Sequence, residues 1–363
     1  MSENGSSRKT EGLWSIVLVE LTNLCNFSCE FCPSDSMDRP KTMMPRELWR
    51  KVLIELGEKK MTRTVFFHLM GEPLLHKDVF EAIRFANAKG LSVSFYTNGA
   101  LLDEEVSEKL LGSLQKGRVV LSMQDITPDE FSRRSHGALS WKGYLDRLKR
   151  FVVKAESRGK NVQVHCLADL RHNLPDIISE ADRIQKVYDR WHELLNGENK
   201  QRINIFDPAR EYPLGKTTTF FVKHKGNWDN KLIGSEMVVR PSERGSCDLV
   251  TDTFAVLADG TCTYCCCDYE GELDLGNAMD DSLEDIYYGE KATRIRQKAK
   301  EGRFIEDRCK ICRGTVVYKK TGKPVPTRSL VSEYYFFLDH FKRYGFLSSL
   351  RKIMDNIRRR LGK

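Results

Sequence analysis

The stretch Leu21–Pro33 reads LTNLCNFSCEFCP and spaces three cysteines, Cys25, Cys29 and Cys32, as C-x3-C-x2-C. A structural zinc site is closed by four protein ligands, so three thiols in one loop suit it poorly. Thiolates are the usual ligands of iron–sulfur clusters. Three of them can hold three irons of a four-iron, four-sulfur cluster and leave the fourth iron open to a ligand that is not protein. The alternative interpretation is three unrelated buried thiols.

Strand-like runs lie on both sides of this loop. Residues 14–21, WSIVLVEL, lead into the cysteines, and residues 64–70, TVFFHLM, end in Gly71-Glu72-Pro73. A lone Gly-Glu-Pro would indicate no more than a turn. Here it follows a strand-like run in the same way as the cysteine loop does, so the two loops are expected at the same edge of a sheet.

The cysteine loop and Gly71-Glu72-Pro73 together resemble the radical S-adenosylmethionine (radical SAM) superfamily. The resemblance implies that Cys25, Cys29 and Cys32 are the catalytic ligands of a [4Fe-4S] cluster whose open iron chelates the amino and carboxylate groups of SAM. In that family an electron from the cluster breaks a carbon–sulfur bond of SAM. The resulting 5′-deoxyadenosyl radical removes a hydrogen atom from the substrate.

The same resemblance assigns cofactor-binding residues. Phe31 stands where the family has an aromatic residue near the adenine. Gly71, Glu72 and Pro73 match the family's GEP motif, whose backbone and acidic group hold the SAM amino group. The family usually has glycine before Gly-Glu, and Met70 stands there instead.

Other polar residues end or interrupt strand-like runs. In the family, residues at the positions of Asn98 and Ser122 contact the SAM ribose and carboxylate. The alternatives are a turn at Asn98-Gly99 and a core hydroxyl at Ser122. His68, and His165 with Cys166 behind it, are interpreted as structural residues.

The fold class is indicated by alternation. Helix-like stretches separate apolar, β-branched runs, which predicts parallel strands with helical crossovers and functional residues at the carboxyl ends of the strands. The resemblance implies an α/β fold, a partial (β/α)6 TIM-like barrel. Strands are expected at 15–22, 63–70, 91–97, 117–123, 161–168 and 202–206, and helices at 45–58, 77–89, 103–114, 141–158 and 174–196.

A second cysteine set follows. Cys247 and Cys265 flank Gly260, and Cys309 and Cys312 form a C-x2-C pair. The spacing resembles the twitch form of the SPASM extension, a small β-hairpin and helix domain whose four thiolates hold an auxiliary [4Fe-4S] cluster. Residues 254–257 and 261–264 predict its hairpin. A structural zinc on the same four sulfurs is the alternative.

The remaining cysteines of this region, Cys262, Cys266 and Cys267, are interpreted as packed thiols. The choice of Cys265 among the three consecutive cysteines rests on the family spacing. A second hypothesis is that one spare thiol donates a hydrogen atom to a substrate radical, as an epimerase requires.

These motifs divide the chain into five parts. We expect a polar N-terminal tail over 1–13, the radical SAM core over 14–207, a connector over 208–243, the auxiliary cluster domain over 244–314 and a basic helical tail over 315–363. The connector contains prolines, glycines and a threonine run and is expected to lie on the substrate side.

Charge and hydropathy exclude several classes of protein. Of the net charge of +8, the segment 342–363 carries +7, so the body is nearly neutral and nucleic acid is not expected as a partner. No apolar run is long enough to span a membrane and no secretion signal is present, which with eleven cysteines predicts a cytoplasmic metalloprotein. The stripe of apolar residues in 345–363 predicts a basic amphipathic helix, lying either on a membrane surface or on protein.

From the resemblance we expect an oxidoreductase. The main expectation is the two-electron dehydrogenation of a carbohydrate-like or cyclitol alcohol, with a small-molecule substrate that is a sugar or is lipid-linked. Flavodoxin or ferredoxin is the expected electron donor. The short segment 1–13 favours this substrate over a leader peptide. The alternatives are epimerisation, peptide modification of the thioether type, and a non-enzymatic electron carrier.

Overall fold

The computed structural model describes residues 12–325, apart from 125–126, 135–138, 171–173, 208–209, 227, 229 and 232, together with residues 341 and 354. The expected amphipathic helix over 345–363 lies outside the described residues except for Met354. Among the described residues no helix is long and apolar enough to cross a membrane.

One curved sheet organises the chain. Its nine strands run in the order β10-β9-β1-β2-β3-β4-β5-β7-β6, and β1 to β5 and β7 are parallel neighbours. The strands of this sheet are β1 Ile16–Val19, β2 Thr64–Phe67, β3 Ser92–Thr97, β4 Gly117–Gln124, β5 Asn161–Ala168, β6 Glu211–Pro213, β7 Thr218–His224, β9 Thr253–Val256 and β10 Cys262–Thr263. A separate pair joins β8 Met237–Arg240 to β11 Thr315–Tyr318.

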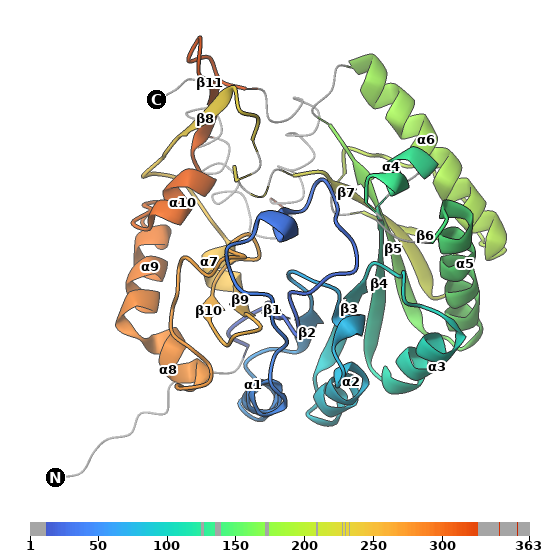
Figure 1. Cartoon of the computed structure of the whole chain (residues 1–363), viewed down its shortest axis with the longest axis horizontal. Coiled ribbons are helices and arrows are strands. Elements are labelled where there is room, and N and C mark those ends of the chain that lie inside the picture. Colours follow the sequence, from blue (N-terminus) through green and yellow to red (C-terminus); the bar gives the residue numbers. More distant parts are fainter. Residues whose placement is uncertain are drawn as a thin grey trace.

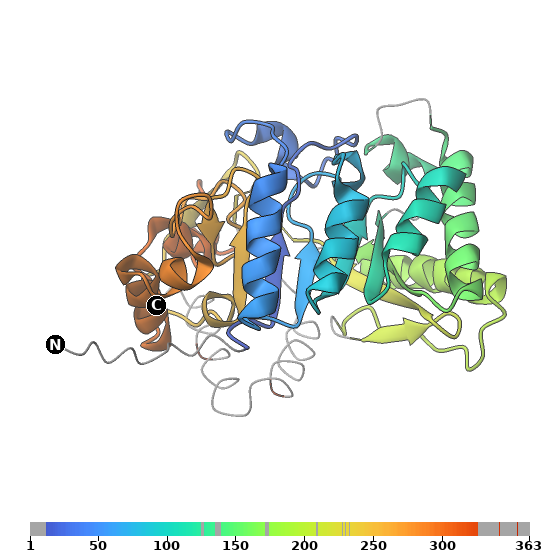
Figure 2. The same ribbon diagram turned by 90° about the horizontal axis from the view of Figure 1, so that it is seen from below.

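Helices cover one side of the sheet. Figure 1 shows α1 Arg46–Glu58, α2 Val79–Ala88, α3 Glu104–Ser113, α5 Trp141–Ser157 and α6 Leu174–Leu194 around its convex side, and Figure 2 shows α1, α2 and α3 standing side by side. We call the opposite, concave side the inner face. The other helices are η1 Pro33–Ser36, η2 Pro73–Leu75, α4 Pro128–Ser132, α7 Leu249–Asp252, α8 Leu283–Tyr288, α9 Glu290–Lys300 and α10 Asp307–Cys312.

Local sequence explains these helices. Asp103 accepts a hydrogen bond from the Val106 amide at the start of α3, and Ser140 accepts one from Gly143 at the start of α5, so each helix begins at a side chain that caps its exposed amides. In α1 the buried residues follow helical spacing, and Trp49 is fully buried against the sheet. The core therefore lies between the helices and the convex side of the sheet.

The prediction of a sixth strand over 202–206 is wrong. No strand forms over 202–206, and β7 takes the sixth parallel position beside β5. Ile203 is buried, but its amide donates to the Gln185 side chain at 2.8 Å and the Asn204 amide donates to the Tyr212 hydroxyl at 2.8 Å. Side chains thus satisfy the backbone that a neighbouring strand would otherwise pair.

The segment expected as a connector therefore contains sheet structure. It includes β6 and β7 of the main sheet and β8, which pairs with β11 from the segment expected as the tail. The first five strands and the five long helices lie where the alternation predicts them. The predicted hairpin corresponds to β9 and β10, which pair as antiparallel strands. Because β9 also pairs in parallel with β1, the cysteine-rich segment continues the main sheet.

Candidate active site

The cysteine loop leaves the carboxyl end of β1. Asn23 fixes the start of this loop. The Asn23 side chain donates to the Pro40 carbonyl at 2.9 Å and accepts from the Thr42 amide at 2.7 Å. A turn closes between Cys29 and Cys32, where the Cys32 amide donates to the Cys29 carbonyl at 2.8 Å. The loop is therefore folded by its own backbone and by one buried asparagine.

The three thiols of the loop converge. Burial raises the pKa of Cys25 to about 11, and the nearby Cys29 contributes to this shift. Burial likewise raises the pKa of Cys32 to about 11, with Cys25 among the contributing charges. A buried thiolate needs a compensating positive charge, which iron supplies, and three such sulfurs in one loop match a cluster with one open iron.

Donors already point at these sulfurs. The Phe27 amide lies 3.4 Å from the Cys25 Sγ and the Asn98 Nδ2 lies 3.8 Å from the same atom. Arg134 Nε lies 3.3 Å from the Cys29 Sγ. Hydrogen bonds to cluster ligands stabilise the thiolate form and tune the cluster potential, so the residues present fit the group that the sequence implies.

Gly71 packs directly against the cysteine loop. It has φ +74°, and a Cβ at this position would lie 2.3 Å from the Thr22 carbonyl oxygen and 2.6 Å from that of Leu24. The next amide, that of Glu72, donates to the Leu24 carbonyl at 2.7 Å. A side chain at Gly71 would therefore push the two loops apart.

The Glu72 carboxylate organises neighbouring backbone. It is 1% exposed; Oε2 accepts from the Asn98 amide at 2.7 Å and Oε1 from the Leu74 amide at 3.1 Å. Burial raises the pKa of Glu72 to about 7 in spite of these bonds. Pro73 begins η2 just behind it. The predicted contact of this acid with the SAM amino group stays a prediction.

Asn98 joins three segments at the end of β3. Its Nδ2 donates to the Asn26 Oδ1 at 2.8 Å in the cysteine loop, and its carbonyl accepts from the Tyr144 hydroxyl at 2.7 Å on α5. Ser122 lies in β4 and accepts through its carbonyl from Arg134 Nη2 at 2.6 Å. The SAM contacts expected of Asn98 and Ser122 stay predictions.

Arg134 is a site residue that sequence reasoning missed. It is 3% exposed, and its guanidinium lies 5.0 Å from the centre of the Phe27 ring while it also contacts Cys29 and the carbonyls of β4. It follows the short helix α4 and belongs to no motif, so no sequence signal marks it. Its position ties the cysteine loop to the fourth strand.

Phe31 contacts the segment that sequence analysis assigned to the connector. Its carbonyl accepts from the Trp228 Nε1 at 2.7 Å. The Trp228 ring meets Tyr269 edge-on at 5.6 Å, and the Trp228 carbonyl accepts from Arg308 at 3.2 Å. Trp228 thus bridges the cysteine loop and the second cysteine region, and the expected place of the connector on the substrate side stays a prediction.

The second cysteine set lies beyond β1. Cys247 precedes α7, and Cys309 and Cys312 lie in α10. Burial is the main cause that raises the pKa of Cys309 to about 12, and the charge of the nearby Cys247 is the second. The two thiols are therefore close. Cys265 packs against the same apolar core as both. The ligand set Cys247, Cys265, Cys309 and Cys312 stays a prediction.

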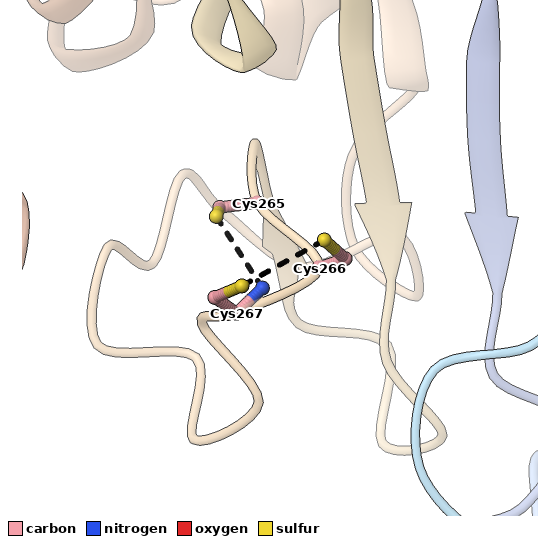
Figure 3. A group of neighbouring side chains, drawn as sticks. All are labelled: Cys265, Cys266 and Cys267. Carbon is pink, nitrogen blue, oxygen red and sulfur yellow. Dashed lines mark hydrogen bonds between the residues drawn. The ribbon is translucent and has the colours of Figure 1, made fainter. Parts of the chain in front are cut away.

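Three consecutive cysteines follow β10. The sulfurs of Cys265, Cys266 and Cys267 lie within 4.8 Å of one another. Figure 3 shows the Cys265 and Cys266 side chains leaving the loop in different directions. Cys266 packs instead with a smaller apolar group that includes Cys32, and Cys262 is fully buried in the main core. Cys266 therefore faces the side of the cysteine loop.

A buried ion pair holds the two cysteine regions together. Arg39 Nη1 lies 2.9 Å from Glu20 Oε2, with side chains 8% and 0% exposed. The Glu20 carboxylate also accepts from the Ala258 amide at 2.9 Å and the Met70 amide at 3.2 Å. Arg39 Nε donates to the Tyr269 carbonyl at 2.8 Å. The pair links the ends of three strands.

We expect Arg39→Met to destabilise the holoprotein by about 3 kcal/mol, because it leaves Glu20 buried without its counter-charge. Anaerobic urea unfolding measures the change. Arg46→Met is the matched control, since the Arg46–Glu81 pair has side chains 55% and 30% exposed and should contribute less than about 1 kcal/mol. Equal losses in the two variants would contradict the assigned role of the Arg39 pair.

Comparison with known families agrees with this geometry. Residues 19–164 match the model of the radical SAM superfamily, and residues 247–313 match the model of SPASM, an iron–sulfur cluster-binding domain. The chain is 26% identical over 185 residues to the PqqA peptide cyclase of Xanthomonas axonopodis pv. citri, covering 48% of each chain. It is 31% identical over 201 residues to that of Bradyrhizobium diazoefficiens, covering 51% of this chain and 49% of the relative.

The chain thus spans about half the length of the curated relatives it matches. Among solved structures, Streptococcus suis SuiB bound to precursor peptide SuiA aligns with TM-score 0.53 at 14% identity, over 88% of this chain and 76% of that chain. The expected open (β/α) architecture and the expected cofactors, SAM and [4Fe-4S], are confirmed. The chain belongs to the radical SAM superfamily and carries a SPASM-type auxiliary iron–sulfur domain.

Proposed function

We propose that this radical SAM enzyme modifies a peptide. The observation that carries the proposal is the match to two curated relatives named PqqA peptide cyclase, at 26% and 31% identity. The match favours the alternative of the sequence analysis over its main expectation, the dehydrogenation of a carbohydrate-like or cyclitol alcohol. An epimerase of peptide residues is a second form of the same proposal.

The residues of the site would divide the work as follows. Cys25, Cys29 and Cys32 would hold the cluster, and the cluster with SAM supplies one-electron cleavage of a SAM carbon–sulfur bond. Gly71 lets the GEP segment lie against the cysteine loop, and Arg134 fixes that loop on β4. Cys247, Cys265, Cys309 and Cys312 would hold the auxiliary cluster.

The two cysteine regions lie beside each other, and we propose that the substrate binds between them. Trp228 contacts Phe31 on one side and Tyr269 on the other, so aromatic surface lies between the regions. Cys32 and Cys266 pack against the same apolar group. A reduced flavodoxin or ferredoxin is the proposed electron donor.

The experiment that tests the proposal compares substrate classes with the anaerobically reconstituted holoenzyme. Synthetic peptide pools on one side, and a set of sugars and cyclitols on the other, are assayed for stimulated release of 5′-deoxyadenosine and for product mass. We expect peptides to stimulate release. Loss of two hydrogens would indicate cyclisation or oxidation, and deuterium uptake at unchanged composition would indicate epimerisation. Stimulation by the alcohols alone would overturn the proposal.

A further inference from the structure

A chain of ring contacts crosses the inner face of the sheet. His68 stacks on Tyr96 at 4.2 Å, Tyr96 meets His165 at 5.9 Å, and His165 lies 4.9 Å from Phe221. Phe221 is also the register partner of His165. Because side chains two residues apart share a face of a strand, Lys223 follows Phe221 on the inner face.

Lys223 has no carboxylate partner among the described residues. Its side chain is exposed, and no carboxylate of the described residues lies within ion-pair distance. Burial and, after it, the Lys223 charge lower the pKa of His68 to about 3, and the same two causes lower that of His165. The strand register agrees with this, because His165 pairs with Phe221 and Leu167 with Lys223, and Tyr96 connects His165 to His68.

Two carboxylates at the strand ends, those of Glu20 and Glu211, are paired with other cations. Glu20 is bound to Arg39, and Glu211 lies 3.1 Å from Arg118 and accepts from the Thr219 hydroxyl at 3.0 Å. Neither carboxylate is left to serve Lys223. Lys223 is therefore a cation of the inner face that forms no ion pair with a carboxylate of the described residues.

His68 offers a second donor. The His165 Nε2 lies 2.6 Å from the Gln163 Oε1, and since that oxygen can only accept, His165 donates its proton there. The His68 ring nitrogens have no hydrogen-bond partner among the described residues. At neutral pH His68 is uncharged and keeps one N–H, so it can donate to an anion beside Lys223.

We propose that Lys223 and His68 bind a carboxylate of the substrate, an acidic side chain of the peptide, on the inner face of the barrel. This inference rests on the proposed function, and it specifies in addition that the peptide substrate carries a negatively charged group. A phosphate group would be bound by the same chemistry, so the test separates the two sources.

The first test is lysine footprinting of the holoenzyme with saturating SAM at constant ionic strength. Acetylation rates of Lys223 and Lys216 are followed by mass spectrometry with glutarate, inorganic phosphate or neutral glutaramide. Lys216 is the matched control because it is exposed and precedes the same strand at its opposite end. We expect glutarate to slow acetylation of Lys223 several-fold and saturably, with no change at Lys216.

Equal effects of glutarate and glutaramide, or equal protection at both lysines, would overturn the inference. Protection by phosphate without protection by glutarate would overturn the carboxylate assignment. Complete protection by SAM alone, with none added by glutarate, would assign the cation to the cofactor and also contradict the inference.

The second test compares peptide pools that contain Glu with pools in which Gln replaces it. We expect Glu pools to be preferred, and Lys223→Met to raise the KM for them roughly tenfold or more with little change in kcat. Lys223→Arg should restore much of the preference. Active peptides without an acid preference would contradict this inference alone, whereas inactive peptides with anion protection of Lys223 would contradict the proposed function alone.

Discussion

Replacing Cys29 by serine should abolish SAM cleavage. The hydroxyl is not ionised at neutral pH and is a poor ligand for iron. Because the three cysteines act as one unit, we expect deoxyadenosine release to fall by roughly three orders of magnitude or more. Chromatographic assay of 5′-deoxyadenosine from reduced, reconstituted protein measures it.

Cys166→Ala is the matched control for this prediction. Cys166 is a fully buried cysteine of β5, whose side chain points to the helix-covered side of the sheet, away from both cysteine regions. The control should keep the rate of SAM cleavage of the parent protein. A Cys29→Ser protein that cleaves SAM as fast as the control would contradict the assignment of the loop.

Replacing Cys309 by serine should separate SAM cleavage from substrate turnover. Cys309 lies near Cys247 and belongs to the second cysteine set, not to the loop that holds Cys25. Losing one of four thiolates weakens the hold on the auxiliary cluster, so the bound iron should fall by up to about half. Deoxyadenosine release should continue, while turnover of any active peptide falls by at least about a hundredfold.

Iron analysis and product assay check this second prediction together. Cys262→Ala is the matched control, because Cys262 is a fully buried cysteine of β10 in the same domain and should keep the iron content. Undiminished iron and turnover in Cys309→Ser would contradict the auxiliary site. One zinc per chain in the parent protein, with iron for a single cluster, would support the zinc alternative instead.

The parts of the site that sequence predicts are those encoded locally. The spacing of Cys25, Cys29 and Cys32 and the Gly71-Glu72-Pro73 turn each lie within one loop, so their chemistry can be read without knowing the fold. Gly71 is required by contact with the Thr22 carbonyl, but the need for glycine there was already implied by the motif.

The parts that sequence misses depend on contacts between distant segments. Arg134 reaches the cysteine loop from beyond β4, and Trp228 joins the two cysteine regions from a segment with no regular pattern. The Glu20–Arg39 pair is formed only when strand ends meet. Each residue is ordinary in its local sequence, so only the folded chain identifies its role.

The sixth strand was misplaced for a related reason. Residues 202–206 have the apolar alternation of a strand, whereas the threonine run that begins β7 carries no such alternation. Pairing with β5 decides between the two segments, because β7 matches β5 residue by residue from Thr218 to His224. Local propensity does not contain that long-range register.

The central claim is that the thiols of Cys25, Cys29 and Cys32 hold a [4Fe-4S] cluster with one iron open to SAM. Electron paramagnetic resonance of the dithionite-reduced Cys309→Ser protein, with and without SAM, tests it most directly. In this variant the signal of the auxiliary cluster is weaker and overlaps less with that of the SAM-binding cluster. We expect a reduced-cluster signal whose g-values change when SAM is added. A signal that SAM leaves unchanged, or one that persists when Cys29 is also replaced by serine, would contradict the account.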